Sequence, residues 1–87
     1  MIGKKLRIIR KSEGLTGQEF SQLVDISANS LKKYETGVRT LSEQNILKVT
    51  NHPRFKKYAL WLITDQTAPE IGQISPEIET EGSRAAG

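Results

Sequence analysis

Residues 15–37 read LTGQEFSQLVDISANSLKKYETG and predict two short helices joined by a tight turn. Thr16 and Glu19 have the spacing of a Thr-x-x-Glu capping box, so the first of these helices should begin next to Thr16. Three apolar residues follow at the spacing of one buried helical stripe: Phe20, Leu23 and Val24. The first helix is therefore expected to be short and amphipathic.

The turn and the second helix have signals of their own. Asp25 stands where the chain must turn sharply, and Asp is among the few non-glycine residues that tolerate a positive φ. Ile26 is expected to fill the corner between the helices, Ser27 to cap the second helix, and Gly37 to end it in the left-handed conformation. Such a helix-turn-helix, at about residues 16–36, is the unit that inserts its second helix into a DNA major groove.

The predicted second helix, at about residues 28–36, has a polar and basic outer face. Leu31 and Tyr34 lie three residues apart and should face the interior. Asn can pair with adenine, Lys can donate to guanine or phosphate, and Ala can touch a thymine methyl group. Lysine and asparagine on a helix are more often only a solvated face, and the residues by themselves leave that alternative open. The outward residues that are candidates for reading bases are Ala28, Asn29, Lys32 and Lys33.

The order of capped helix, turn, Ser-capped helix and glycine stop resembles the helix-turn-helix of the phage-repressor and Cro-like family, also called lambda repressor-like or XRE-type. The family pattern is approximately L-T-Q-x-E-L-A-x-x-x-G-[VI]-S-x-x-T-[IL]-x-x-[YIW]-E-x-G, and the resemblance extends over about residues 2–63. The matching residues are Leu15, Thr16, Glu19, Phe20, Ile26, Ser27, Ser30, Leu31, Tyr34, Glu35 and Gly37.

Three residues depart from this pattern. Ser21 replaces the small Ala that packs between the helices and Asp25 replaces the turn Gly, and both changes are sterically tolerable. Gly17 replaces a Gln that commonly touches a DNA phosphate in the family, so that contact is not carried over. The expected substitute is Gln18 or the bare amide of Gly17.

The resemblance implies a compact, all-α, five-helix domain that binds double-stranded operator DNA as a homodimer. It implies a transcriptional regulator, in the simplest case a repressor of prophage or bacterial type.

Helix capping is the competing explanation for Thr40, and a mobile surface charge is the competing explanation for Arg39. Trp61, in the last helix, either packs into the core or contacts the second copy. The residues expected to hold the DNA backbone are Gln18, Ser27, Ser30, Thr36, Arg39, Thr40 and Arg10.

The positive charge is unevenly distributed along the 87 residues. The formal net charge is only +3, but residues up to Leu60 include twelve Lys or Arg against five Asp or Glu, a net of +7. From Trp61 onward there is one Arg against five acidic residues, a net of −4. A small basic body is typical of a protein that binds phosphates. Solubility is an alternative reason for such charge, and composition alone leaves it open.

Composition also limits the kinds of chemistry to expect. The chain has no cysteine and one histidine, His52, so neither a disulfide nor a zinc site is expected. There is no Gly-rich phosphate loop or nucleophile arrangement, and we expect no enzyme activity, cofactor, metal or small-molecule substrate. The longest apolar run, residues 58–63, is too short to cross a bilayer, and no signal segment opens the chain. We therefore expect a cytoplasmic protein without a membrane partner.

A first helix precedes the helix-turn-helix. Ile2, Leu6 and Ile9 repeat at helical spacing, and Gly14 ends this helix. Basic residues occupy much of its remaining surface: Lys4, Lys5, Arg7, Arg10 and Lys11. They are either a solvated helix surface, or Lys4, Arg10 or Lys11 lies in reach of DNA phosphates.

Two further helices are expected after Gly37. Thr40 and Glu43 have capping-box spacing, which predicts that the fourth helix begins at Thr40, with Leu41, Ile46, Leu47 and Val49 on its inner face. Pro53 is expected to be the first residue of the fifth helix, whose apolar residues are Phe55, Tyr58, Ala59 and Leu62.

The last part of the chain has a different character. Residues 1–63 are expected to form the helix-turn-helix domain, and residues 64–87 an irregular acidic tail or linker, because prolines, glycines and single isoleucines follow there without any period. Ile71, Ile74 and Ile78 could dock on the domain.

A protein-interaction module on the same scaffold, such as an antitoxin or an adaptor, is the alternative to a DNA-binding regulator. The polar outward residues Asn29, Lys32 and Lys33 favour DNA, because a helix that binds protein more often shows apolar anchors.

Overall fold

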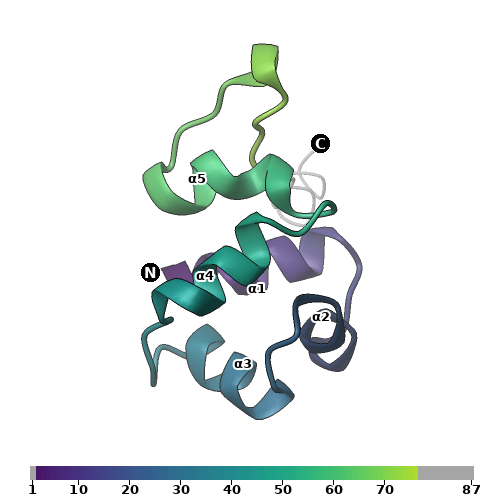
Figure 1. The fold of residues 1–87 in the computed structure, drawn as a ribbon, viewed down its shortest axis with the longest axis vertical. Helices are drawn as coiled ribbons and strands as arrows, with labels where there is room; N and C mark the ends of the chain where they lie inside the picture. The colour runs from purple at the N-terminus through teal and green to yellow at the C-terminus, as the bar shows by residue number, and fades with distance from the viewer. Residues whose placement is uncertain (1, 77–87) are drawn as a thin grey trace, which may run out of the picture.

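The computed structural model describes residues 2–76, which form five α-helices and two short 3-10 helices. The expected all-α fold of five helices with a helix-turn-helix is confirmed. Along the longest axis of the molecule, α2 and α3 lie at one end, α1 and α4 in the middle, and α5 with the segment after it at the other end (Figure 1). In chain order the elements are α1 (Ile2–Ser12), α2 (Gly17–Val24), α3 (Ala28–Glu35), α4 (Glu43–Thr50), η1 (Lys56–Tyr58), α5 (Ala59–Thr64) and η2 (Pro69–Ile71).

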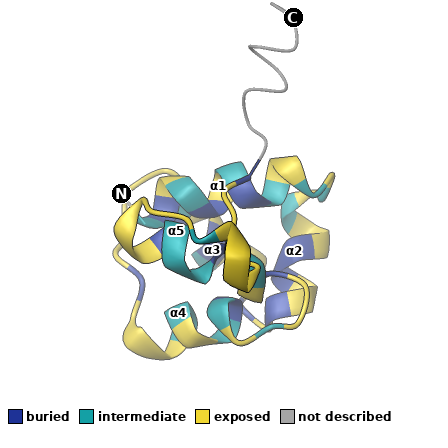
Figure 2. Ribbon diagram, turned by 90° about the horizontal axis from the view of Figure 1, so that it is seen from above, coloured by how far each residue is buried: buried dark blue, intermediate teal, exposed yellow. Residues whose placement is uncertain are grey.

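One hydrophobic core connects these helices, each of which is buried on one side and exposed on the other (Figure 2). Phe20 of α2 meets Phe55 edge to face, with ring centroids 4.9 Å apart, and both side chains are almost fully buried. Such pairs are favourable beyond the area that they bury. The core therefore holds the helix-turn-helix against the rest of the domain through Leu6, Ile9, Phe20, Val24, Ile26, Leu31, Tyr34, Leu41, Val49, Phe55, Tyr58 and Leu62.

The local signals of the helix-turn-helix are confirmed at the atomic level. The Thr16 hydroxyl accepts from the Glu19 amide at 3.1 Å, and the Glu19 carboxylate accepts from the Thr16 amide at 2.9 Å. Asp25 has a φ of 58°, and Gly37 has a φ of 82°. The Ser27 hydroxyl accepts from the Ser30 amide at 3.1 Å, which caps α3. These caps fix where α2 and α3 begin and end.

Two positions on α2 show how the interior accommodates the sequence. Ser21, in place of Ala, is buried between the helices, and its hydroxyl donates to the Gln18 carbonyl at 2.7 Å. The buried hydroxyl is therefore satisfied within its own helix. Leu23 was expected in the buried stripe, but its side chain is 39% exposed, because Phe20 and Val24 already fill the core side of this short helix.

Helix α1 lies directly against the backbone at the end of α3. A Cβ atom built on Gly3 would be 2.0 Å from the Tyr34 carbonyl oxygen and 2.8 Å from its carbonyl carbon. Only a glycine fits this contact without displacement of one of the two helices. Gly3 therefore sets how closely α1 approaches α3.

The predicted start of the fourth helix at Thr40 is wrong. Helix α4 begins at Glu43, and Ser42 is its N-cap, with its hydroxyl accepting from the Asn45 amide at 3.1 Å. Thr40 is exposed and makes no cap, because Ser42 offers a better-placed hydroxyl two residues later. Leu47 was expected on the inner face but is 46% exposed.

The predicted start of the fifth helix at Pro53 is also wrong. Pro53 lies in a turn in which the amides of Phe55 and Lys56 donate to the His52 carbonyl at 3.0 and 2.9 Å. Helix η1 follows this turn, and α5 begins at Ala59. The expected apolar residues Phe55 and Leu62 are nevertheless buried, because a turn followed by a 3-10 helix brings side chains to one side at nearly helical spacing.

Residues 65–76, here called the strap, fold back on η1 and α5. The Gln73 side chain accepts from the Leu60 amide at 2.9 Å and donates to the Lys56 carbonyl at 3.0 Å. The strap contains the 3-10 helix η2 and a single bridge between Ala68 and Gln73, and it is anchored to the domain rather than free. The rest of the predicted irregular tail lies outside the described residues. Ile71, which was expected to dock, is 71% exposed, and Ile78 lies outside the described residues.

Candidate nucleic-acid interface

The outer face of α3 is accessible to a ligand. Leu31 and Tyr34 hold the helix in the core with 1% and 5% of their surface exposed. No other described segment covers the opposite face, whose residues are all exposed: Ala28, Asn29, Lys32 and Lys33. The structure thus presents the four predicted base-reading residues together, with amide and ammonium groups directed to solvent.

The Tyr34 hydroxyl is also satisfied in the interior. It accepts from the Asn45 side-chain amide at 2.7 Å, so a hydrogen bond joins α3 to α4. The packing of Tyr34 against Gly3 on one side and the bond to Asn45 on the other fix the C-terminal half of α3. The orientation of its outer face is therefore set by three elements: α1, α2 and α4.

The hydroxyl groups predicted to hold phosphates lie near the two ends of α3. Ser27 is exposed at the N-terminal end, and Ser30, one turn later, is half-buried. Thr36 is exposed at the C-terminal end, and its hydroxyl donates to the Lys32 carbonyl at 2.9 Å. A hydroxyl oxygen that donates in this way can still accept from a ligand, but it has no hydrogen left to give to a phosphate.

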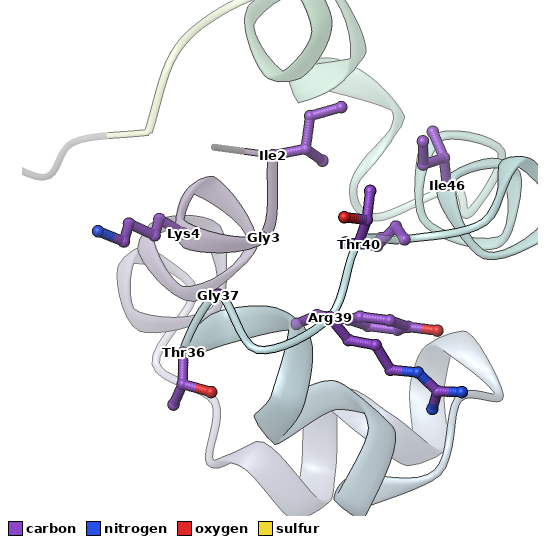
Figure 3. A pocket seen from close by; sticks show the side chains of 10 residues that line it. Ile2, Gly3, Lys4, Thr36, Gly37, Arg39, Thr40 and Ile46 are labelled. Atoms are coloured by element: carbon purple, nitrogen blue, oxygen red, sulfur yellow. The ribbon is translucent and has the colours of Figure 1, made fainter.

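Arg39 and Thr40 lie on the loop that leaves α3. The amides of Val38 and Arg39 both donate to the Lys33 carbonyl, at 2.9 and 3.1 Å, which turns the loop sharply. The loop borders a hollow of about 610 Å³ against the beginning of α1, where Ile2, Gly3 and Lys4 lie (Figure 3). Both loop residues are exposed, so they are accessible to a DNA backbone.

Arg10 is engaged within the fold. Its Nε and Nη2 atoms donate to the two carboxylate oxygens of Glu35 at 2.9 and 3.0 Å, and its Nη1 atom donates to the Leu15 carbonyl at 3.0 Å. Only 15% of the Arg10 side chain and 9% of the Glu35 side chain are exposed. This bidentate pair joins α1 to α3 and neutralises the charge of Arg10, and a phosphate contact by Arg10 stays a prediction.

Trp61 is partly buried and packs against the core. The Lys5 ammonium lies 5.1 Å from the centre of its ring, donates to the Trp61 carbonyl at 3.1 Å and pairs with Asp65. A role for Trp61 between two copies stays a prediction. The more exposed apolar neighbour on α5 is Ile63, with 53% of its surface accessible.

Arg7, a cation beside α3, was not among the predicted phosphate contacts, whereas Lys4 on the same helix was an open candidate. Lys4 and Arg7 of α1 line a second groove, which α3 borders on its other side with Ala28 and Lys32. Their spacing of three residues on an amphipathic helix puts them on one face, and that pattern was a signal in the sequence.

The described residues contain no group of three or more His, Cys, Asp or Glu side chains arranged to hold a metal ion. Among the same residues, no helix has the length and apolar character needed to span a membrane.

Comparison with known proteins points in the same direction as the geometry. A family model described as helix-turn-helix matches residues 6–54. The chain is 38% identical to Repressor protein C of Escherichia phage P2 over 77 residues, which are 88% of this chain and 78% of the phage protein. It is 46% identical to Antitoxin PezA of Streptococcus pneumoniae serotype 4 over 46 residues, which are 53% of this chain and 29% of that protein.

Proposed function

Because the chain belongs to the helix-turn-helix family of DNA-binding domains, we propose that it is a sequence-specific transcriptional regulator that reads an operator with α3. The observation that carries this proposal is the outer face of α3, which is exposed, polar and free of apolar anchors. A major groove accepts one α-helix and offers the donors and acceptors that amide and ammonium groups recognise.

Asn29 is the residue that we propose for direct base reading. Its side chain is exposed near the start of α3, and an asparagine can pair with adenine through two hydrogen bonds. Ala28 beside it suits a thymine methyl group, and Lys33 one turn further along can donate to guanine. At the ends of α3, the Ser27 hydroxyl keeps its hydrogen to donate to a phosphate, and Thr36 would have to exchange its bond to the Lys32 carbonyl for one. The other residues that we propose for the DNA backbone are Gln18, Ser30, Arg39 and Thr40.

Repression by occupation of the operator is the mode that the comparisons favour. Repressor protein C of phage P2 is similar to 88% of this chain, and the similarity covers the strap as well as part of the helical domain. We propose a repressor of prophage or bacterial type that acts in the cytoplasm. The division into a DNA-binding domain over residues 1–63 and a tail over 64–87 is part of this proposal.

We further propose that the regulator binds as a homodimer. Two-fold pairing would set two copies of α3 about 34 Å apart, one turn of DNA, and would match a palindromic operator. The apolar surface of α5 around Trp61 and Ile63 is the candidate contact, because Ile63 is exposed there.

A protein-interaction module of the antitoxin kind is the second candidate, favoured by the similarity to Antitoxin PezA. That similarity covers 46 residues and 29% of the antitoxin. It is therefore compatible with a shared helix-turn-helix in proteins of different function. The two candidates differ in whether the chain alone recognises DNA.

The test is a selection of bound sequences from random duplexes with the full chain, followed by affinity measurements on the best sequence. We expect a palindrome as the selected site. We expect Asn29→Ala to weaken binding by about 1 to 3 kcal/mol and to relax preference at one position of each half-site. Gln66→Ala, which removes an exposed amide beyond α5, is the control and should change neither quantity. Absence of any selected sequence would favour the interaction module.

A further inference from the structure

A groove of about 660 Å³ runs between α1 and α3 and reaches the first turn of α2. Ala28 and Lys32 belong both to this groove and to the outer face of α3, so the two surfaces are continuous. Asn29 and Lys33 do not line the groove. The outer face of α3 is therefore divided into one edge beside α1 and another edge away from it.

The groove carries positive charge without internal compensation. Arg10, which also lines it, is neutralised by its bidentate pair with Glu35. Lys4, Arg7 and Lys32 are exposed, and their side chains make no hydrogen bond or ion pair with any other residue within 2–76. Three cations of the same sign that line one groove repel one another, and an anion bound among them would relieve that repulsion.

The end of the groove at α2 offers backbone donors. In the first turn of α2, the Glu19 amide donates to the Thr16 hydroxyl, and the Phe20 amide donates to the Thr16 carbonyl. The amides of Gly17 and Gln18 have no partner among the described residues, as is usual for the first turn of a helix. A Cβ atom on Gly17 would have nothing within 4 Å, so this end of the groove is open to a ligand.

We infer that the groove binds the sugar-phosphate backbone of the duplex beside the bases that α3 reads, with Arg7 as the central phosphate contact. This inference rests on the proposed function. Lys4 and Lys32 contribute charge on the two walls, while the free amides of α2 bind at the open end. Arg suits the central position because its planar fork donates two parallel hydrogen bonds to a phosphate.

The assignment changes the roles expected along α3. Lys32 faces the groove wall of α1 and therefore holds the backbone rather than a base. Hydrogen-bonded base reading is left to Asn29 and Lys33, on the edge away from α1, while Ala28, which borders the groove, keeps its proposed contact with a thymine methyl group. Arg7 also supplies a phosphate contact where Gly17 has no side chain to offer one.

The test uses the full chain and its selected operator, with affinity measured over a salt series. Arg7→Gln should weaken binding roughly tenfold at low salt and reduce the slope of log K against log salt by about 1, because one fewer counterion-releasing contact is made. Lys4→Gln should act in the same direction. Arg7→Lys should restore the slope but not the whole affinity, because it keeps the charge and loses the fork.

Lys56→Gln is the matched control, because it removes the same charge as Lys4→Gln from an exposed position on η1 that does not line the groove. Its salt slope should equal that of the unmodified chain. None of the four variants should unfold at a lower denaturant concentration than the unmodified chain, since the substituted side chains have no partners within residues 2–76 and the loss of a groove cation only relieves repulsion.

The failures of the two proposals are distinguishable. If the unmodified chain binds no DNA at any salt concentration, the proposed function fails, and this inference fails with it. If it binds its operator with a steep salt dependence but Arg7→Gln keeps the affinity and slope, only the groove assignment is wrong. A changed base preference in Arg7→Gln, with an unchanged slope, would also overturn it, because a backbone contact carries no sequence information directly.

Discussion

The positive charges at the two ends of the molecule are used differently. Beside α3, Lys4, Arg7 and Lys32 have no partner within residues 2–76. At the end formed by α5 and the strap, Lys5 pairs with Asp65 and donates to two backbone carbonyls. The same kind of side chain therefore stays available at one end and is incorporated into the fold at the other.

Cations on η1 and on the loop that precedes it are also paired within the fold. The Glu13 carboxylate, at the end of α1, accepts from Tyr58 at 2.5 Å, from Arg54 at 2.8 Å and from Lys57 at 3.2 Å. Arg54 also donates to the Glu13 carbonyl at 3.1 Å. We call Glu13 with Arg54, Lys57 and Tyr58 the Glu13 cluster, and it ties α1 to the chain that leads into α5.

The comparison shows that net charge is a poor guide to where an anion binds. A cation that already has a carboxylate partner is a poor neutraliser of a phosphate and releases few of the cations condensed on DNA, whereas an unpaired cation that neutralises a phosphate releases about one. Among the described residues, unpaired cations therefore indicate a DNA-binding face where several of them line one groove, as Lys4, Arg7 and Lys32 do, whereas the unpaired Lys56 on η1 lies outside it. Variants at the two ends should separate stability from salt-dependent binding.

The largest effect is expected from Gly3→Ala, which tests whether α3 is held at its end by direct backbone contact. The added methyl group would overlap the Tyr34 carbonyl, so one helix must move, and we expect a loss of about 3 kcal/mol in the free energy of unfolding. Urea denaturation followed by circular dichroism measures this loss. A variant as stable as the unmodified chain would show that α1 can move away from α3 without cost.

Glu13→Gln tests whether the cations of the Glu13 cluster stabilise the fold rather than bind DNA. The amide keeps the size of the carboxyl group but loses charge-assisted hydrogen bonds, and we expect a loss of about 2 kcal/mol near neutral pH. The salt slope of operator binding should stay the same, since these groups lie outside the groove. Glu70→Gln, at an exposed carboxyl group on η2, is the control and should change neither quantity.

The pH dependence of the same variant gives a second measurement. Burial by itself would raise the pKa of Glu13, but the hydrogen bonds from Tyr58, Arg54 and Lys57 outweigh burial and hold that pKa below its usual value of 4.5. A lowered pKa contributes stability above 4.5 that is lost as the pH falls through the folded-state pKa. The difference between Glu13→Gln and the unmodified chain should therefore shrink in acid, and a constant difference would contradict the role assigned to the charge.

A smaller effect is expected from Gln73→Ala, which removes the anchor of the strap. The Leu60 amide and the Lys56 carbonyl would both lose a partner, and the expected loss of stability is about 1 kcal/mol. Hydrogen exchange at the Leu60 amide should become faster. Gln66→Ala, whose side chain makes no contact of this kind within residues 2–76, should leave that exchange rate unchanged.

How well a feature could be predicted from the sequence depended on how far apart in the chain the interacting residues lie. The capping box of Thr16 and Glu19 and the glycine stop at Gly37 were right, because each depends on atoms a few residues apart. Thr40 was wrong although it has the same local pattern, because Ser42 competes for the same helix start and a pattern cannot rank the two.

Contacts between distant residues could not be predicted in this way. Glu35 matched the family pattern, but nothing local shows that its carboxylate meets Arg10, which is 25 residues away in the chain. The anchoring of the strap by Gln73 is of the same kind, since its partners on η1 and α5 lie 17 and 13 residues earlier. The exposed outer face of α3 could be predicted because the periodicity of α3 alone determines it, whereas the groove needs α1, α2 and α3 together.

The smallest effect is expected from Gly17→Ala, which tests how closely the backbone at the start of α2 approaches DNA. Gly17 lies outside the left-handed region and a Cβ atom there would contact nothing, so the fold does not require a glycine, unlike at Gly3. Alanine should raise the free energy of unfolding by about 0.5 kcal/mol, because it restricts the unfolded chain. Operator affinity should stay the same, because the family pattern has a Gln at this position and the methyl group of alanine is smaller. Stability and affinity are measured together, and a variant that gains stability but loses affinity would show that the backbone at this point approaches the duplex too closely for any side chain.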